Sequence, residues 1–199
     1  MGGTVATGYG RVTFPADREV SEITCQAKGI HHLFPTAQTI IDIGGQDSKV
    51  IQLMPSGKVM DFAMNDKCAA GTGRFLEVMA SALEVSLNEV GQLAAGSRHP
   101  TTISSFCTVF AESEVIGQVS AGTPKEDILA GVCEAVARRV SSLAQRISVL
   151  PDLVFTGGVA RNQGVVKALE RCLNQPLLIH SEPSITAALG AALLASQLH

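Results

Sequence analysis

Three short apolar segments between residues 39 and 62 place the strongest constraint on what this chain can fold into. The first, residues 39–43, is β-branched and ends at two glycines. The second, residues 49–54, ends at a Pro-Ser-Gly turn, and the third covers residues 58–62. Runs of this length and composition, bounded by glycine and proline, are typical of strands joined by tight turns. The sequence therefore predicts a three-stranded meander.

The rest of the chain alternates between two hydrophobic periods. Apolar residues three and four positions apart predict helices over residues 21–34, 75–83, 87–95, 125–147, 162–173 and 184–198. Short apolar runs predict further strands at residues 101–105, 153–155 and 177–179, while residues 1–14 are expected to be extended or looped. Strands followed by alternating helices and strands form an α/β layer pattern, which is the fold class we expect.

Composition excludes several functional classes. The net charge is −3 and aromatic residues make up 4% of the chain, so neither a basic field nor a stacking surface for nucleic acid is present. No apolar run approaches the roughly 18 residues that a membrane helix needs, and the first residues lack the apolar core of a signal peptide. These features predict a cytoplasmic protein. Five cysteines without pairing spacings argue against a disulfide framework.

Two glycine pairs stand at the ends of predicted strands. Residues 42–47 place Gly44 and Gly45 between carboxylates, where the backbone can approach an anion and the acids can hold Mg²⁺ through water. An ordinary hairpin explains this pair equally well. Gly157 and Gly158 follow residues 153–155 and can open a flat slot for a base or ribose. Taken alone, the second pair is better explained as an ordinary strand-to-helix turn.

Two cysteines occur where the chain changes from one element to a helix. Cys68 stands just before a predicted helix, and Cys107 lies near a strand-to-helix change. A helix N-terminus lowers the pKa of a thiol and stabilises an anionic cluster, and an iron–sulfur cube needs four thiolates, which two chains can supply. The alternative is burial as apolar side chains, which we favour for Cys133 and Cys172. Cys25 remains unassigned.

In this order and spacing, the glycine pairs resemble the actin-like ATPase superfamily, which includes the Hsp70 chaperones and the sugar kinases and has a ribonuclease H-like fold. Residues 42–46 match its second phosphate motif, and residues 156–159 match its adenosine motif. Residues 22–29 and 187–192 resemble two small-residue helices that cross at its domain hinge. The resemblance implies that Glu22 and Asp42 handle the attacking water and the metal. It also implies a nucleotide site formed by Gly44, Gly45, Gln46, Asp47, Gly157, Gly158, Val159 and Asn162.

A narrower resemblance covers nearly the whole chain. The segments IDIGGQD (41–47), CAAGTGR (68–74) and TVFAESE (108–114) together resemble the activator, or component A, of 2-hydroxyacyl-CoA dehydratases, in the BadF/BadG/BcrA/BcrD ATPase family that also contains benzoyl-CoA reductase subunits. The resemblance implies a homodimer that shares one [4Fe–4S] cluster through Cys68 and Cys107 of each chain. It further implies ATP or ADP with Mg²⁺, reduced ferredoxin or flavodoxin as donor, and one electron passed to the dehydratase in anaerobic metabolism.

The resemblance also predicts how the chain divides. The superfamily opens with an Asp-x-Gly-Ser/Thr phosphate motif that residues 1–20 do not contain. We therefore expect an N-terminally shortened chain, in which residues 1–35 are a remnant of the first ATPase domain. Residues 36–199 would form the second domain, with the helix over 184–198 at the hinge. Two alternatives remain, a dimerising remnant without catalysis and a kinase of the same fold without a cluster.

Overall fold

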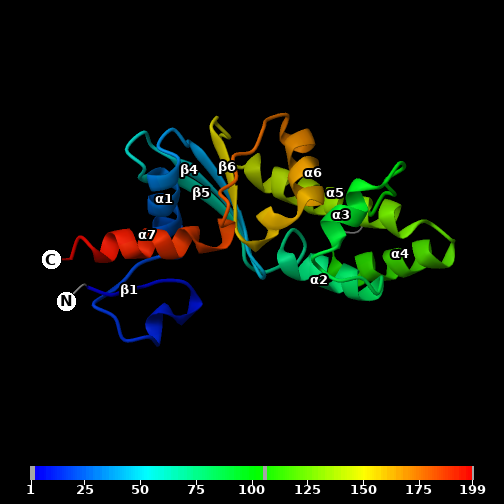
Figure 1. Ribbon diagram of the computed structural model, residues 1–199, viewed down its shortest axis with the longest axis horizontal. Coiled ribbons are helices and arrows are strands. Elements are labelled where there is room, and N and C mark those ends of the chain that lie inside the picture. Colours follow the sequence, from blue (N-terminus) through cyan, green and yellow to red (C-terminus); the bar gives the residue numbers. More distant parts are fainter. Residues whose placement is uncertain (1–2, 105–106, 199) are drawn as a thin grey trace.

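A four-stranded mixed sheet forms the centre of the computed structural model, which describes residues 3–104 and 107–198 (Figure 1). Its strands are β3 (Thr39–Ile43), β4 (Ser48–Leu53), β5 (Val59–Asn65) and β6 (Leu153–Thr156). Their order is β5-β4-β3-β6. β4 is antiparallel to both of its neighbours, β3 and β5, and β6 is parallel to β3. The predicted meander and the predicted strand at residues 153–155 are confirmed.

Seven α-helices surround the sheet within the described residues. They are α1 (Glu22–Leu33), α2 (Gly73–Ala82), α3 (Val90–Ala95), α4 (Thr108–Ser120), α5 (Lys125–Ala144), α6 (Gln163–Leu173) and α7 (Thr186–Ala195). The sequence analysis gave no bounds for α4, although it expected a helix to begin near Cys107. The apolar period of α4 is obscured because Val109, Phe110 and Ile116 lie on its exposed face, opposite the buried Ala111 and Val115.

The sheet is covered on both faces, as Figure 1 shows with α1 and α7 on one side and α3, α5 and α6 on the other. Ile40 and Ile51 pack toward α1, in one cluster with Ile30. Their chain neighbours Ile41 and Val50 pack in the larger cluster with α5 and α6. β3 and β6 are buried along their whole length, which explains why they appear as mostly apolar runs in the sequence, whereas much of the edge strand β5 is exposed.

The predicted strand over residues 101–105 is wrong for its described part, residues 101–104, and residue 105 lies outside the described residues. This segment lies against α5, where the amide of Thr101 donates to the Asp127 carbonyl at 3.0 Å. The Arg138 guanidinium donates to the Ile103 carbonyl at 2.9 Å. Because α5 satisfies these backbone groups, the segment does not join the sheet. The predicted strand over residues 177–179 is reduced to one parallel bridge, between Leu178 and Val154.

The N-terminal segment is mostly irregular, as predicted. It contains a two-residue parallel pair, β1 (Val5–Ala6) with β2 (Arg18–Glu19), and a 3₁₀ turn at Tyr9–Val12. A small apolar cluster that includes Val20 and Ala191 packs β1 and the start of α1 against α7. None of the helices in the described part of the chain has both the length and the apolar character needed to cross a bilayer.

Helices α1 and α7 cross with their backbones in contact. A Cβ atom on Gly190 would lie 1.7 Å from the Cys25 carbonyl oxygen, and one on Gly29 would lie 2.0 Å from the Thr186 carbonyl oxygen. Only glycine fits at either position, because both distances are far below van der Waals contact. The crossing of two small-residue helices is therefore present as predicted. Its role as a hinge, and the division into residues 1–35 and 36–199, stay predictions.

Candidate nucleotide site and cysteine loops

The two glycine turns meet at one edge of the sheet. β3 and β6 are parallel neighbours with Asp42 opposite Thr156, so the turns that follow them lie side by side. Gly157 has φ +87°, and a Cβ atom there would lie 2.3 Å from the Ile43 carbonyl oxygen. Gly157 is therefore required twice, by its backbone conformation and by the closeness of the other turn. The fold brings together two motifs that stand more than a hundred residues apart in the sequence.

A cavity of about 530 Å³ opens beside these turns. Five of the residues predicted for nucleotide binding line it, namely Gly44, Gly45, Gly158, Val159 and Asn162. Its other walls come from α2 through Leu76, from α3 through Gly91, and from the segment between these helices through Leu87. Ligand pockets for small molecules are typically several hundred Å³ and mostly apolar with a few polar groups, which fits this cavity. Of the other predicted residues, Gln46 is exposed, Gly157 holds the turns together, and Asp47 belongs to a separate charged cluster.

Asn162 is held in place by its role as the N-cap of α6. Its side-chain oxygen accepts a hydrogen bond from the amide of Val165 at 3.1 Å. A Cβ atom on Gly91 would come within 2.8 Å of the same oxygen, so α3 packs directly against the Asn162 side chain. The cap thus fixes a polar group at the wall of the cavity.

Three carboxylates from separate elements converge on one lysine beside the glycine turn. The ammonium of Lys49 lies 2.9 Å from Asp47 Oδ1, 3.5 Å from Glu22 Oε2 and 3.7 Å from Asp42 Oδ2. The two residues predicted as catalytic, Glu22 and Asp42, are therefore brought together. The sequence analysis missed Lys49. A signal was available, because a lysine in a strand buried on both faces needs a charged partner, and the register places Lys49 opposite Asp42.

The pKa values within this cluster follow from burial and charge. Burial raises the pKa of Asp42 to about 6, the Lys49 ammonium works against this rise, and the neighbouring acids add to it. Burial by itself would lower the pKa of Lys49, but the carboxylates of Asp42, Asp47 and Glu22 outweigh it and the pKa is raised. Lys49 therefore stays charged at neutral pH, and its charge makes ionisation of the deeply buried Asp42 easier.

The carboxylates surround this ammonium rather than an open metal position. Carboxylate oxygens are the donors that Mg²⁺ prefers. Nevertheless, within the part of the chain that the structure describes, no group of three or more His, Cys, Asp or Glu side chains is placed to hold a metal ion. The cluster borders a second cavity of about 430 Å³, lined by Glu22, Asp47 and Lys49 together with Tyr9 and Arg11.

The loop that carries Cys68 is tied to the first glycine turn. The amides of Gly73 and Arg74, which begin α2, donate to the carbonyls of Gly44 at 2.8 Å and Gly45 at 2.7 Å. Upstream, the side-chain amide of Asn65 donates to the Cys68 carbonyl at 2.8 Å. The first two amides of α2 are therefore occupied by the glycine turn. They are not free to face Cys68, as the helix-terminus argument required.

Cys107 does lie at a helix start, because it is exposed and occupies the N-cap position of α4. Cys68 is half-buried. The predicted burial of Cys133 is confirmed, but the prediction for Cys172 is wrong, because its side chain is exposed near the end of α6. The buried stripe of α6 runs through Val165, Val166, Ala168 and Leu169, and Cys172 lies outside it. Cys25, which was unassigned, is buried.

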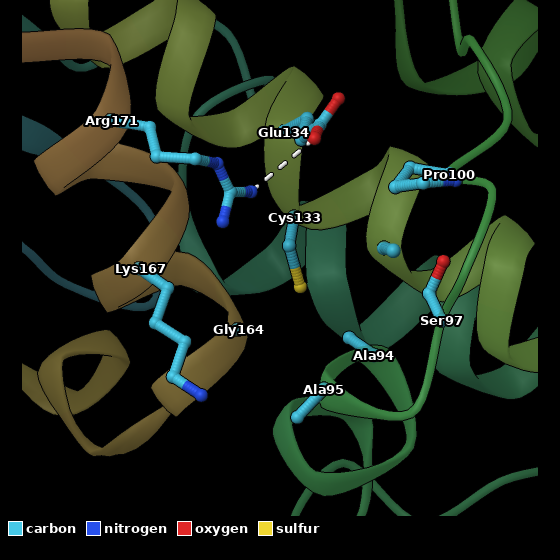
Figure 2. Close-up of a pocket in the computed structure, with 10 residues that line it drawn as sticks. Ala94, Ala95, Ser97, Pro100, Cys133, Glu134, Gly164, Lys167 and Arg171 are labelled. Carbon is cyan, nitrogen blue, oxygen red and sulfur yellow. Dashed lines mark hydrogen bonds and ion pairs between the residues drawn. The ribbon is translucent and has the colours of Figure 1, made fainter.

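Cys133 points into a third cavity, of about 420 Å³, which Figure 2 shows between α3, α5 and α6. At one side, the Arg171 guanidinium pairs with the Glu134 carboxylate at 3.3 Å. Burial raises the pKa of the Cys133 thiol to about 12, so this thiol stays protonated at neutral pH. A neutral thiol is a poor metal ligand, and Cys133 is therefore set apart from Cys68 and Cys107.

A mixed sheet flanked by helices, with adjoining glycine turns at one edge and two small-residue helices crossing at the other side, defines an actin-like ATPase fold. Residues 1–195 match the BadF/BadG/BcrA/BcrD ATPase family, and the chain belongs to that family. The resemblance stated from the sequence is thereby confirmed.

Relatives with assigned names agree with this assignment. A protein named 2-hydroxyisocaproyl-CoA dehydratase activator, from Clostridioides difficile, is 52% identical over 192 residues, which cover 96% of this chain and 72% of the relative. The activator of lactoyl-CoA dehydratase from Anaerotignum propionicum is 55% identical over 193 residues, covering 96% and 74%. The solved structure of the Clostridium difficile 2-hydroxyisocaproyl-CoA dehydratase activator with bound ADPNP superposes with a TM-score of 0.96 at 50% identity, covering 98% of this chain and 73% of that one.

Proposed function

We propose that this chain is an ATP-dependent activator that passes single electrons to a 2-hydroxyacyl-CoA dehydratase or a related acyl-CoA reductase. In this proposal two copies share one [4Fe–4S] cluster. The observation that carries it is the pair of hydrogen bonds from Gly73 and Arg74 to the carbonyls of Gly44 and Gly45. They connect the turn expected to hold phosphate with the loop that bears Cys68. A change in the bound nucleotide could therefore reach the Cys68 loop through these backbone hydrogen bonds.

The nucleotide would occupy the cavity of about 530 Å³. Its phosphates would lie against the turn at Gly44 and Gly45, where the two glycines carry no side chain and let an anion approach the backbone, and its base and ribose against Gly158 and Val159. Support comes from the size and lining of the cavity and from the ADPNP bound to a relative that is 50% identical. Glu22, 33% exposed and at the start of α1, would orient the attacking water. The buried Asp42 would position the phosphate turn, and Mg²⁺ would arrive with the nucleotide.

Loss of the terminal phosphate would shift the position of the start of α2. The carbonyls of Gly44 and Gly45 accept the first amides of this helix, so a shift of the turn displaces the helix start and the Cys68 loop with it. Coupling between two sites can be carried by hydrogen bonds and rigid elements that join them, and these two hydrogen bonds form such a connection. We therefore assign α2 as the element that transmits the state of the nucleotide to the cysteine.

The cluster would be held by Cys68 and Cys107 of each copy and would supply one-electron redox chemistry when bound. Two features of the residues support this. Cys107 is exposed at the N-cap position of α4, where a bound anionic group would face a helix N-terminus, and Cys68 is half-buried in the loop directly before α2. Reduced ferredoxin or flavodoxin would donate the electron, and the dehydratase would receive it.

Anaerobic purification tests the proposal. We expect a brown protein with about four irons per dimer, and loss of the iron in Cys68→Ser and in Cys107→Ser. Cys172→Ser is the matched control, because Cys172 is also exposed but lies outside both loops, and it should keep the iron. A colourless, iron-free wild-type protein after anaerobic reconstitution would contradict the cluster.

Nucleotide turnover is measured separately. Release of phosphate from ATP by the iron-loaded dimer, faster in the presence of the dehydratase, is the expected result. Iron binding without any hydrolysis would instead favour a dimerising protein that does not catalyse. Hydrolysis without iron would favour a kinase-like member of the fold.

A further inference from the structure

We propose that the Lys49 ammonium is an internal cation that occupies the position a metal ion would otherwise take among Glu22, Asp42 and Asp47. In this view the carboxylate cluster is complete without metal, and it takes up a divalent cation only when Lys49 is displaced or removed. The metal-exclusion part of the proposal stands whether or not the chain binds nucleotide.

The first argument is the placement of the side chain. Lys49 lies in the middle of the sheet, and its side chain is only 3% exposed. A buried ammonium costs several kcal/mol unless charged partners compensate, so a lysine is not retained here as a mere space-filler. Its partners come from three different elements: Glu22 begins α1, Asp42 lies in β3 and Asp47 follows the glycine turn. The ammonium therefore stands at the one point that all three carboxylates share.

The second argument concerns the carboxylates. Asp42 and Asp47 have side chains only 7% and 8% exposed, and the ammonium forms ion pairs with both buried carboxylates and compensates their charge. Carboxylate oxygens are also the donors that a divalent metal prefers, but as they lie around the ammonium these three acids are not placed to hold one, so a metal ion would require them to move closer together. The contacts of 2.9, 3.5 and 3.7 Å to Lys49 show that the point is already filled by an ammonium. A metal ion would have to displace it.

The third argument is the open space beside the cluster, into which the Lys49 ammonium can move. Lys49, Glu22 and Asp47 all line the cavity of about 430 Å³, so the cluster has an open side next to the glycine turn. A flexible four-carbon stem would let the ammonium turn from a carboxylate toward a phosphate held at the glycine turn, which Asp47 closes by accepting the Gly44 amide at its carbonyl. This last step rests on the proposed function. It makes Lys49 a positioning residue that holds the acids converged before nucleotide arrives.

Metal binding without nucleotide tests the proposal. The probe is Mn²⁺ alone, followed by electron paramagnetic resonance and calorimetry at neutral pH on the full chain. Lys49→Met should bind one Mn²⁺ at least about tenfold more tightly than wild type, because removal of the ammonium leaves three converging carboxylates. Lys49→Arg should stay close to wild type. Lys58→Met is the matched control, since it removes an exposed lysine beside the same sheet and makes the same change in net charge.

Folding is controlled with a second variant. Without a cation the three acids repel, so Lys49→Met should unfold at lower temperature in EDTA and recover with Mn²⁺. The double variant Glu22→Gln with Lys49→Met carries one charge fewer and keeps Asp42 and Asp47. If neither variant binds Mn²⁺ more tightly than wild type, or neither folds even with Mn²⁺, the proposal is wrong. Wild type binding Mn²⁺ as tightly as Lys49→Met would also overturn it. Titration with ADP is done separately, so a failure to bind nucleotide affects only the proposed function.

Discussion

The crossing of α1 and α7 makes a quantitative prediction for Gly190→Ala. The added Cβ atom would lie 1.7 Å from the Cys25 carbonyl oxygen. Non-bonded contacts need about 3.5 Å, so the two helices must separate by roughly 2 Å at this point. Such a movement also pulls the side-chain amide of Gln26 away from the Thr186 hydroxyl, which it now contacts at 2.9 and 3.1 Å in the buried interior.

The expected cost follows from these two effects. Overpacking of a well-packed interface costs about 1–3 kcal/mol, and leaving a buried amide without its partner costs a similar amount. Alanine in place of glycine inside a helix returns about 1 kcal/mol. The net expectation for Gly190→Ala is a loss of about 3 kcal/mol in the free energy of unfolding.

Urea unfolding followed by far-ultraviolet circular dichroism measures this loss. Gly117→Ala is the matched control, because Gly117 is also inside a helix but has no atom within 4 Å of the added Cβ. The control should gain up to about 1 kcal/mol. Equal stability of Gly190→Ala and wild type would refute the backbone contact between α1 and α7.

Three further predictions concern single side chains. Burial raises the pKa of Asp42 from 3.8 to about 6, so the folded protein binds this proton more tightly than the unfolded chain does. The free energy of unfolding should therefore fall as the pH rises from about 4 to 6, and Asp42→Asn should reduce that slope; parallel pH profiles of the two proteins in urea would contradict this. Asn162→Ala should lose about 1 kcal/mol in urea through the missing cap of α6, whereas Asn162→Asp should keep it; equal losses would exclude a capping role. Iodoacetamide should alkylate the exposed Cys172 in the folded protein and spare Cys133, whose pKa burial raises to about 12. Mass spectrometry of the peptides checks this, and labelling of both thiols at similar rates would show that the interior around Cys133 opens readily.

The strands show how far local pattern reaches. Residues 39–43 and 153–155 were predicted correctly, because a strand buried on both faces has to be apolar throughout. Residues 101–104 have similar residue types and form no strand. The two cases differ in the hydrogen-bond partners of the backbone. Residues 39–43 and 153–155 pair with neighbouring strands, whereas residues 101–104 bond to Asp127 and Arg138 of α5.

The cysteines show the same limit. Cys107 was correctly placed at a helix start, since the change of pattern around it is a local feature. Cys172 was expected to be buried, because it follows the apolar positions of α6 at nearly the right spacing, yet it is exposed. Which side of a helix is covered depends on the elements packed against it, and no local period contains that information.

Local sequence was sufficient for the glycine turns and the meander, since each depends on residue types within one short segment. Only the folded chain revealed Lys49 among three carboxylates and the hydrogen bonds from α2 to Gly44 and Gly45. The reason is physical. A buried charge and a backbone link are defined by groups from separate elements, and those groups meet only when the strand register and the helix packing place them at one point.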